Sequence, residues 1–253
     1  MLVQSATSGA VTEHGGAQAA TVPVSEFTRP SERARHRVRD PKVVRAARRA
    51  NCNLKRYFDV AATLIGGLFL LPFFVTIALL IKLDDGGPVF FGHRRVGRRG
   101  AEFKCWKFRT MVQDSDDALR RYLEANPEAE TEWRETQKLQ NDPRVTRVGK
   151  FLRDFSLDEL PQVFNVLRGE MSLVGPRPVT KQELNARYAS DRRYYLLVRP
   201  GLTGLWQVSG RNKLSYRRRI QLDEQYLREW SFSQDLSILW RTVDVVIRRD
   251  GAY

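Results

Sequence analysis

The chain has 253 residues, a formal net charge of +14 at neutral pH and an isoelectric point of about 10.2. This length suits one domain of moderate size with additional segments. The strongly basic balance indicates an anionic partner, which can be nucleic acid, anionic lipid or a phosphate-rich substrate. Cys52 and Cys105 are the only two cysteines. They are too few for a disulfide framework or a zinc site, which indicates a reducing compartment.

The N-terminal part differs in composition from the rest. Residues 1–27 are rich in Ala, Gly, Ser, Thr and Val and contain few aromatic residues, so we predict a disordered tail. Residues 28–52 are strongly basic. The remaining residues, 53–253, are expected to form one domain.

Residues 60–81 form an apolar run without a charged residue, just long enough to cross a hydrocarbon layer of about 30 Å as a helix. Both flanks are enriched in Lys and Arg, which mark the cytoplasmic side of a membrane, so both ends are expected on that side. Pro72 removes a helix donor and predicts a kink. These features favour a re-entrant helix hairpin that breaks at Pro72, with residues 28–52 as a juxtamembrane segment on anionic lipid. A spanning helix with a tolerated proline is the alternative.

The chain after the apolar run alternates between short strands and amphipathic helices, which predicts an α+β fold. The expected elements are a β-hairpin at 89–96 and 102–110, helical segments within 113–140 broken at Asn126-Pro127, an apolar-periodic stretch at 151–167, and a helix at 232–247. Glycine and proline mark loops at 175–178 and 199–204. The apolar face expected for the last helix carries Phe232, Leu236, Leu239, Val243 and Val246.

The segment S-L-D-E at 156–159 is the strongest candidate for chemistry. Ser156 and Glu159 have capping-box spacing, which would place Asp158 and Glu159 in the first turn of a helix. Acidic residues there can simply complement the helix dipole. Alternatively, an ionised Asp158 is a competent nucleophile toward phosphorus. Glu159 would then be a ligand of Mg²⁺, because that ion prefers one or two carboxylates together with substrate phosphates.

Several cations near glycine and proline loops suit a diphosphate, because arginine binds phosphate oxygens with two parallel hydrogen bonds. They are Arg153, Arg177 between Pro176 and Pro178, Lys107, Arg109 and Arg211. Each of them alone is more often a surface charge. The sequence contains no Walker A loop, and its aromatic residues form no stacking series of the kind that single-stranded nucleic acid requires. Nucleic acid is therefore not expected as a partner.

Four long motifs resemble a known family. They are FxxWKFRTM at 103–111, SLDELPQ at 156–162, RGEMSLVGPRP at 168–178 and RPGLTGLWQVSGRN at 199–212. Together they resemble the bacterial sugar transferases, the monotopic polyprenyl-phosphate phosphoglycosyl transferases, over roughly residues 53–253. The likeness is greatest to the short exopolysaccharide-initiating enzymes that transfer galactose 1-phosphate.

The resemblance implies roles for individual residues. The family's Asp-Glu dyad matches Asp158 as nucleophile and Glu159 as metal ligand, and an essential arginine matches Arg153. The family's conserved lysine matches Lys107, and its Pro-Arg-Pro loop, which helps to hold the nucleotide, matches the loop around Arg177. A late essential aspartate matches either Asp223 or Asp235. Many members have Ser-Pro at the membrane break, where this chain has Leu71-Pro72.

The resemblance also implies an activity and a location. The expected enzyme transfers a hexose 1-phosphate, galactose or glucose, from a UDP-sugar to polyprenyl (undecaprenyl) phosphate through an aspartyl-phosphosugar, with Mg²⁺ as cofactor. Its catalytic domain of amphipathic helices and a small β-hairpin would face the cytosol at the bacterial inner membrane. Two alternatives are a glycosyltransferase that moves only the sugar, and a basic membrane scaffold or nucleic-acid binder without catalysis. The sequence leaves the hexose and the oligomeric state open.

Overall fold

The computed structural model describes residues 41–136, 139–188 and 192–248, so the predictions for residues 1–27 and 28–40 lie outside it. The first described helix is α2 (Pro41–Ala50). We expected a juxtamembrane segment on anionic lipid in this region. The residues form a helix whose apolar face is buried in the protein, with Val43 only 1% exposed. Its basic residues Arg45, Arg48 and Arg49 are exposed.

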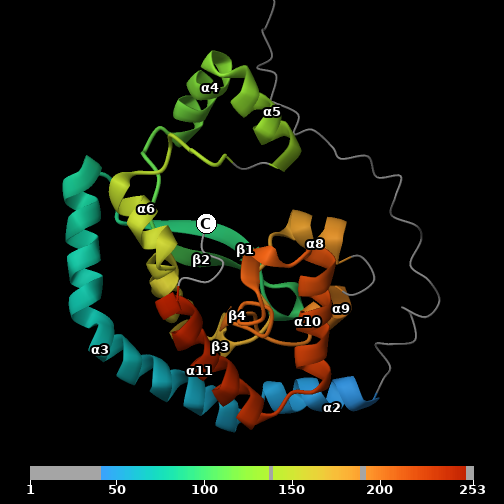
Figure 1. Cartoon of the computed structure of the whole chain (residues 1–253). Coiled ribbons are helices and arrows are strands. Elements are labelled where there is room, and N and C mark those ends of the chain that lie inside the picture. The colour runs from blue at the N-terminus through green and yellow to red at the C-terminus, as the bar shows by residue number, and fades with distance from the viewer. Residues whose placement is uncertain (1–40, 137–138, 189–191, 249–253) are drawn as a thin grey trace, which may run out of the picture.

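The apolar run lies within α3 (Asn53–Asp85), a continuous helix that contains Pro72 and bends along its length (Figure 1). The Cys52 side chain caps its start, and Gly86 ends it in the left-handed region with φ of 72°. In the described residues, α3 is the helix long and apolar enough to cross a membrane. Only 11% of its most apolar window is buried, so α3 is not the core helix of a globular body.

Both ends of α3 pack against the same body, whereas its middle is exposed. Near the start, Lys55 and Asp59 are buried, and near the end Ile77 and Ile81 are buried. Ile77 and Ile81 pack against β2 (Glu102–Phe108) and α6 (Arg147–Asp154). Phe69, between the two contact regions, is 77% exposed. The exposed middle therefore forms an apolar surface on the outside of the protein.

Residues before and after α3 share one hydrophobic cluster. Val43 and Ala47 of α2 pack with Tyr226 and Leu227 of α10 (Tyr216–Arg228). Ile238 of α11 (Phe232–Arg248) belongs to the same cluster. The chain therefore leaves this core through α3 and returns to it.

The predicted β-hairpin is confirmed. β1 (Phe90–Val96) pairs antiparallel with β2 around a tight turn at η2 (Arg98–Gly100). A second small sheet pairs β3 (Ser172–Val174) with β4 (Gly201–Thr203) in parallel. The loops that follow these two strands cross in direct backbone contact, because a Cβ on Gly204 would lie 2.2 Å from the carbonyl oxygen of Gly175.

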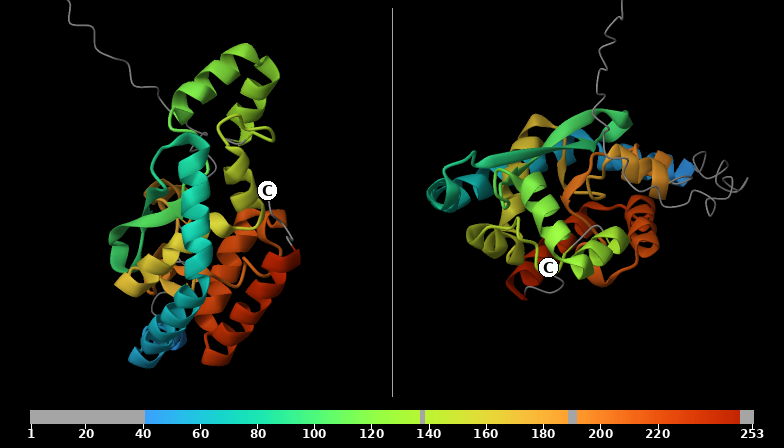
Figure 2. Two further views of the ribbon diagram at one scale, coloured as in Figure 1. Left: turned by 90° about the vertical axis from the view of Figure 1, so that its left-hand side faces the viewer. Right: turned by 90° about the horizontal axis from the view of Figure 1, so that it is seen from above.

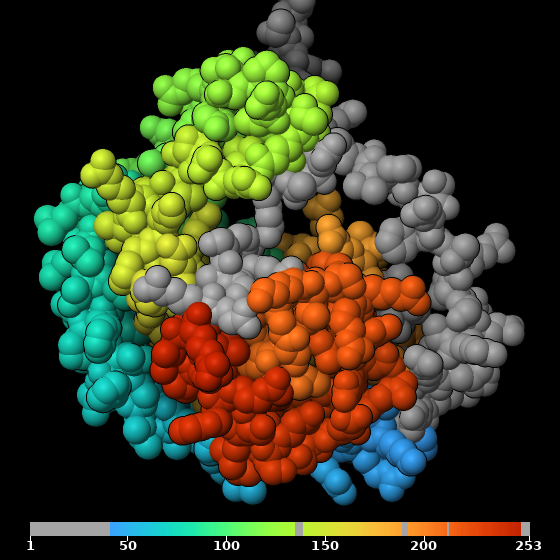
Figure 3. Space-filling view, in the orientation of Figure 1, coloured from blue at the N-terminus to red at the C-terminus, as the bar shows by residue number. Residues whose placement is uncertain are grey.

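The remaining helices surround these sheets. They are α4 (Ser115–Ala125), α5 (Pro127–Thr136), η3 (Leu157–Gln162), α7 (Val163–Arg168), α8 (Lys181–Arg187), α9 (Arg192–Tyr195) and η4 (Arg211–Lys213). The break predicted at Asn126-Pro127 separates α4 from α5, and these two helices project above α6 as an arm (Figures 1 and 3). The α+β architecture is confirmed, with helices as its main component.

The last helix is confirmed, but the face that it buries differs from the expected one. Asp235 and Ile238 are buried, whereas Leu236 is 44% and Val243 is 55% exposed. The predicted face was wrong because hydrophobic periodicity counts an aspartate as a solvent-facing residue. α11 lies beside α3 when the protein is viewed from the α3 side (Figure 2, left), and Phe232 contacts Phe58 of α3 edge to face at 5.0 Å.

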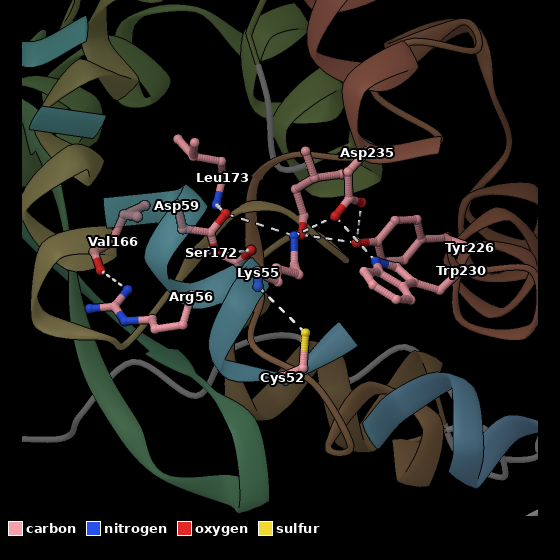
Figure 4. Close-up of polar contacts among 11 residues, drawn as sticks. Cys52, Lys55, Arg56, Asp59, Val166, Ser172, Leu173, Tyr226, Trp230 and Asp235 are labelled. Carbon is pink, nitrogen blue, oxygen red and sulfur yellow. Dashed lines mark hydrogen bonds and ion pairs between the residues drawn. The ribbon is translucent and has the colours of Figure 1, made fainter. Parts of the chain in front are cut away.

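A buried polar network fixes the start of α3 to the body (Figure 4). The Lys55 ammonium lies 2.6 Å from a carboxylate oxygen of Asp235 and 3.8 Å from one of Asp59. Tyr226 and Trp230 donate hydrogen bonds to Asp235. Ser172 and the backbone of Leu173 donate to Asp59. These donors offset the cost of burying charge, so α3, β3, α10 and α11 are held together at one point.

Replacing Lys55 with Met should lower the free energy of unfolding by about 3–5 kcal/mol, because two buried carboxylates would lose their shared cation. Asp235→Asn should cost less, since Lys55 would retain Asp59. Urea unfolding of the detergent-solubilised protein, followed by tryptophan fluorescence, measures both losses. Equal losses for the two variants would contradict the shared role of Lys55.

Candidate functional site

Asp158 and Glu159 lie in the first turn of η3, as their sequence position predicted. The predicted capping box is wrong. Ser156 adopts a left-handed conformation with φ of 58°, and its side chain makes no capping hydrogen bond to the helix. Its hydroxyl accepts a hydrogen bond from the Arg211 guanidinium at 2.6 Å instead. The S-x-x-E spacing therefore marks a contact with a distant loop.

The Lys107 ammonium joins the two carboxylates. It donates to Asp158 Oδ2 at 3.1 Å and to Glu159 Oε1 at 2.7 Å. β2 packs along η3, and this brings a lysine from the hairpin to the acidic pair. Among the residues that the structure describes, Lys107 provides all of the hydrogen bonds to these two side chains. The site therefore holds two carboxylates against one lysine at close range.

The pKa values follow from this arrangement. Burial alone would raise the pKa of Glu159, but Lys107, Arg177 and Arg211 lower it to about 2. Burial raises the pKa of Asp158 above its ordinary value; Lys107 opposes this rise and Glu159 adds to it. Burial would lower the pKa of Lys107, but the two carboxylates raise it to about 12. Lys107 and Glu159 therefore stay charged at neutral pH.

Three of the predicted arginines surround this pair. Arg177 and Arg211 act on Glu159, and Arg153 lowers the pKa of Asp158. The Arg153 Nε donates to the Thr110 hydroxyl at 2.9 Å, which orients that guanidinium. Sequence reasoning did not identify Thr110 or Ser156 as holding arginines. Thr110 directly follows Lys107-Phe108-Arg109, and this position next to two candidate cations was the only sequence feature that could have indicated its role.

The structure places Arg109 differently. Its guanidinium pairs with Asp85 at the end of α3. Gly87 lies so close to this guanidinium that a Cβ there would overlap it. Arg109 thus connects the end of the apolar helix to the strand that carries Lys107, and its predicted role in substrate binding stays a prediction.

The two candidate late aspartates have different surroundings. Asp235 belongs to the Lys55 network. Asp223 accepts a hydrogen bond from the Tyr188 hydroxyl at 2.9 Å, and burial raises its pKa to about 8 although Arg177 opposes the rise. Pro176 and Pro178 are both buried on either side of Arg177. Asp223 is therefore the candidate that is linked electrostatically to the site.

Asp158 and Glu159 could hold a magnesium ion only together with oxygens from a bound substrate or from water. The described residues contain no cluster of three or more His, Cys, Asp or Glu side chains. Asp158 and Glu159 supply two carboxylates, which matches the preference of Mg²⁺ for one or two carboxylates completed by phosphate oxygens and water. Cys105 is not a candidate nucleophile, because burial raises its pKa to about 11.

Comparisons with known proteins agree on one family. The model described as "Bacterial sugar transferase" matches residues 50–249. The exopolysaccharide production protein ExoY of Rhizobium meliloti is 51% identical over 213 residues, which cover 84% of this chain and 94% of that protein. The UDP-galactose-lipid carrier transferase of Erwinia amylovora is 53% identical, covering 79% of this chain and 42% of that protein. For the undecaprenyl-phosphate galactose phosphotransferase of Salmonella typhimurium the identity is 50%, with coverages of 82% and 43%.

Asp223→Asn should remove a pH dependence of stability. The pKa of Asp223 is about 8 in the folded protein against an ordinary 3.8, so between these values the folded state keeps a proton that the unfolded state has lost. The free energy of unfolding of the wild type should therefore fall as pH rises through this window, by up to about 1.4 kcal/mol per pH unit.

The Asn variant keeps an acceptor for Tyr188 and lacks this fall, so its stability relative to wild type should rise with pH. Urea unfolding of both proteins at several pH values in the window measures the difference. Parallel curves would contradict the assignment.

Proposed function

Because the chain belongs to the bacterial sugar transferases and is a phosphoglycosyl transferase, we propose that it transfers galactose 1-phosphate from UDP-galactose to undecaprenyl phosphate. The product would be the first lipid-linked intermediate of an exopolysaccharide. The observation that carries the proposal is the pair of the buried Asp158 and the half-buried Glu159, which Lys107 joins and arginines surround. Galactose is favoured over glucose because two relatives named for galactose are 53% and 50% identical to this chain, whereas two named for glucose are 42% and 41% identical.

In the proposed reaction, Asp158 is the nucleophile. Its carboxylate attacks the β-phosphorus of the UDP-sugar, the bond between that phosphorus and the bridging oxygen breaks, and UMP leaves. The phosphate oxygen of undecaprenyl phosphate then attacks the aspartyl-phosphosugar, and the carboxylate is regenerated. Lys107 binds Oδ2 of Asp158 and does not bind Oδ1. Oδ1 is therefore the oxygen that would attack the phosphorus.

The arginines and the lysine of the site would have different roles in this reaction. Arg153, Arg177 and Arg211 would bind the diphosphate oxygens and offset the charge that develops on them. Lys107 holds Asp158 and Glu159 in fixed positions beside them. A Mg²⁺ ion held by Glu159 and the diphosphate would supply further charge neutralisation.

The membrane anchor is proposed to be a re-entrant α3 that enters the cytoplasmic leaflet of the inner membrane and returns. Two observations support this path. α2 and α10, on either side of α3 in the sequence, share one hydrophobic cluster, which would be impossible if they lay on opposite sides of a bilayer. The middle of α3 exposes large apolar side chains, and α11, whose Phe232 contacts Phe58 of α3, exposes Leu236, Trp240 and Val243. The exposed Arg45, Arg48 and Arg49 of α2 suit anionic headgroups.

Asp158→Asn should abolish turnover without loss of the fold, because the amide keeps the shape of the side chain and removes the nucleophile. Purified enzyme with UDP-sugar and undecaprenyl phosphate should release UMP, and with UDP-sugar alone one phosphosugar should remain on Asp158, detected by intact-protein mass spectrometry. The same assay with EDTA tests the metal. Release of UDP in place of UMP would indicate transfer of the sugar alone, and substantial activity of Asp158→Asn would overturn the mechanism.

Single cysteines at Arg48 and Ser233, in a chain whose Cys52 and Cys105 are replaced by Ser, test the path of α3. Neither position should react with an impermeant reagent in intact cells, and both should react after the membrane is opened. A matched Pro72→Leu variant restores the backbone N–H donor that proline lacks, and it should shift part of the population toward a crossing. Labelling of only one position in the chain that retains Pro72 would show that α3 spans the bilayer.

A further inference from the structure

Trp206 is a buried residue that contacts two arginines of the site, Arg177 through its ring and Arg211 through its backbone. It lies in the loop after β4 and is only 2% exposed. The guanidinium carbon of Arg177 lies 5.6 Å from the centre of the Trp206 ring, and that of Arg219 lies 4.8 Å from it. Tryptophan is the aromatic side chain that attracts cations most strongly, and the attraction grows when water is excluded.

The backbone of Trp206 contacts the second arginine. Its carbonyl oxygen accepts hydrogen bonds from the backbone N–H groups of Ser209 and Arg211. Gly210, with φ of 131°, and Arg211, with φ of 49°, complete this tight turn in conformations that side chains rarely adopt. The turn directs the Arg211 guanidinium to the Ser156 hydroxyl, two residues before Asp158.

We propose that Trp206 is a positioning residue: its indole fixes the Arg177 guanidinium, and its carbonyl fixes the turn of Arg211, so that both arginines face the carboxylate pair. The buried prolines around Arg177 fix its backbone only, and the long side chain needs a separate support. The inference rests on the proposed function in one respect, since it takes Arg177 to bind the diphosphate of the donor.

Two substitutions at Trp206 separate the ring from the backbone, because both leave the carbonyl in place. Trp206→Phe keeps a smaller aromatic face, and Trp206→Leu removes it. Trp206→Leu should raise the KM for the UDP-sugar by about 5- to 10-fold with a smaller change in kcat, and Trp206→Phe should restore most of that loss. Arg219→Met is the matched control, because Arg219 touches the same ring from α10, and its KM should stay within about twofold of wild type.

A double-mutant cycle tests whether Trp206 acts through Arg177. In an Arg177→Met background, Trp206→Leu and Trp206→Phe should have no further effect on KM, since the guanidinium that they orient is gone. Additive effects in folded proteins, or an unchanged KM in Trp206→Leu, would overturn the proposal. If Trp206→Leu does not fold, as judged by thermal unfolding, Trp206→Phe alone decides: its effect must disappear in the Arg177→Met background.

A readout without activity keeps this inference separate from the proposed function. The Arg177 Nε–H resonance, assigned through Arg177→Met, should show a ring-current shift in the wild type that Trp206→Leu abolishes and Trp206→Phe partly retains. Absence of the shift in the wild type would overturn the positioning role. If the shift is present but the wild type releases no UMP from any UDP-sugar, the proposed function fails and the positioning of Arg177 stands.

Discussion

The structure depends on a hydrophobic cluster built from residues on both sides of an apolar helix. Val43 of α2 precedes α3 and Leu227 of α10 follows it, yet both belong to one cluster of buried side chains. Burial of a large aliphatic side chain stabilises a protein by about 1.5–3 kcal/mol, so separating the two segments across a bilayer would forfeit much of the stability of the domain. The core therefore constrains where α3 can go, independently of any preference of its own sequence.

Charged side chains also fix both ends of α3 to the body of the protein. Lys55 pairs with Asp235 at the start, and Asp85 pairs with Arg109 at the end. Arg109 directly follows β2, the strand that carries Lys107, so the end of the apolar helix and the carboxylate pair are connected through the last residues of that strand. The proposed transfer from a soluble donor to a lipid acceptor would require the site at a fixed depth, and these two ion pairs would hold the site at a fixed position relative to α3.

Local sequence patterns predicted the elements well and their long-range contacts poorly. The hairpin, the break before Pro127 and the terminal helix followed from turn residues and periodicity. The buried face of α11 did not, because the charge of the buried Asp235 is paired with Lys55, which lies 180 residues away. Ser156 likewise has the spacing of a cap but binds Arg211, which lies 55 residues later. The acidic pair and Lys107 were candidates from their residue pattern, and the family resemblance gave them roles, whereas Thr110 and Trp206 became visible only when distant loops were brought together.

Two lysines in this protein each hold a pair of acids, and the difference between them separates structure from chemistry. Around Lys55, the acids also receive hydrogen bonds from Ser172, Tyr226 and Trp230, so their acceptor capacity is largely used. Around Lys107, the described residues provide no donor to Asp158 or Glu159 except the lysine itself. The Asp158 and Glu159 side chains are 13% and 24% exposed, so their remaining oxygens can be reached from solvent by a metal ion or by phosphorus. This access favours Asp158 and Glu159, rather than the fully enclosed Asp59 and Asp235, as the reactive pair of the proposed mechanism.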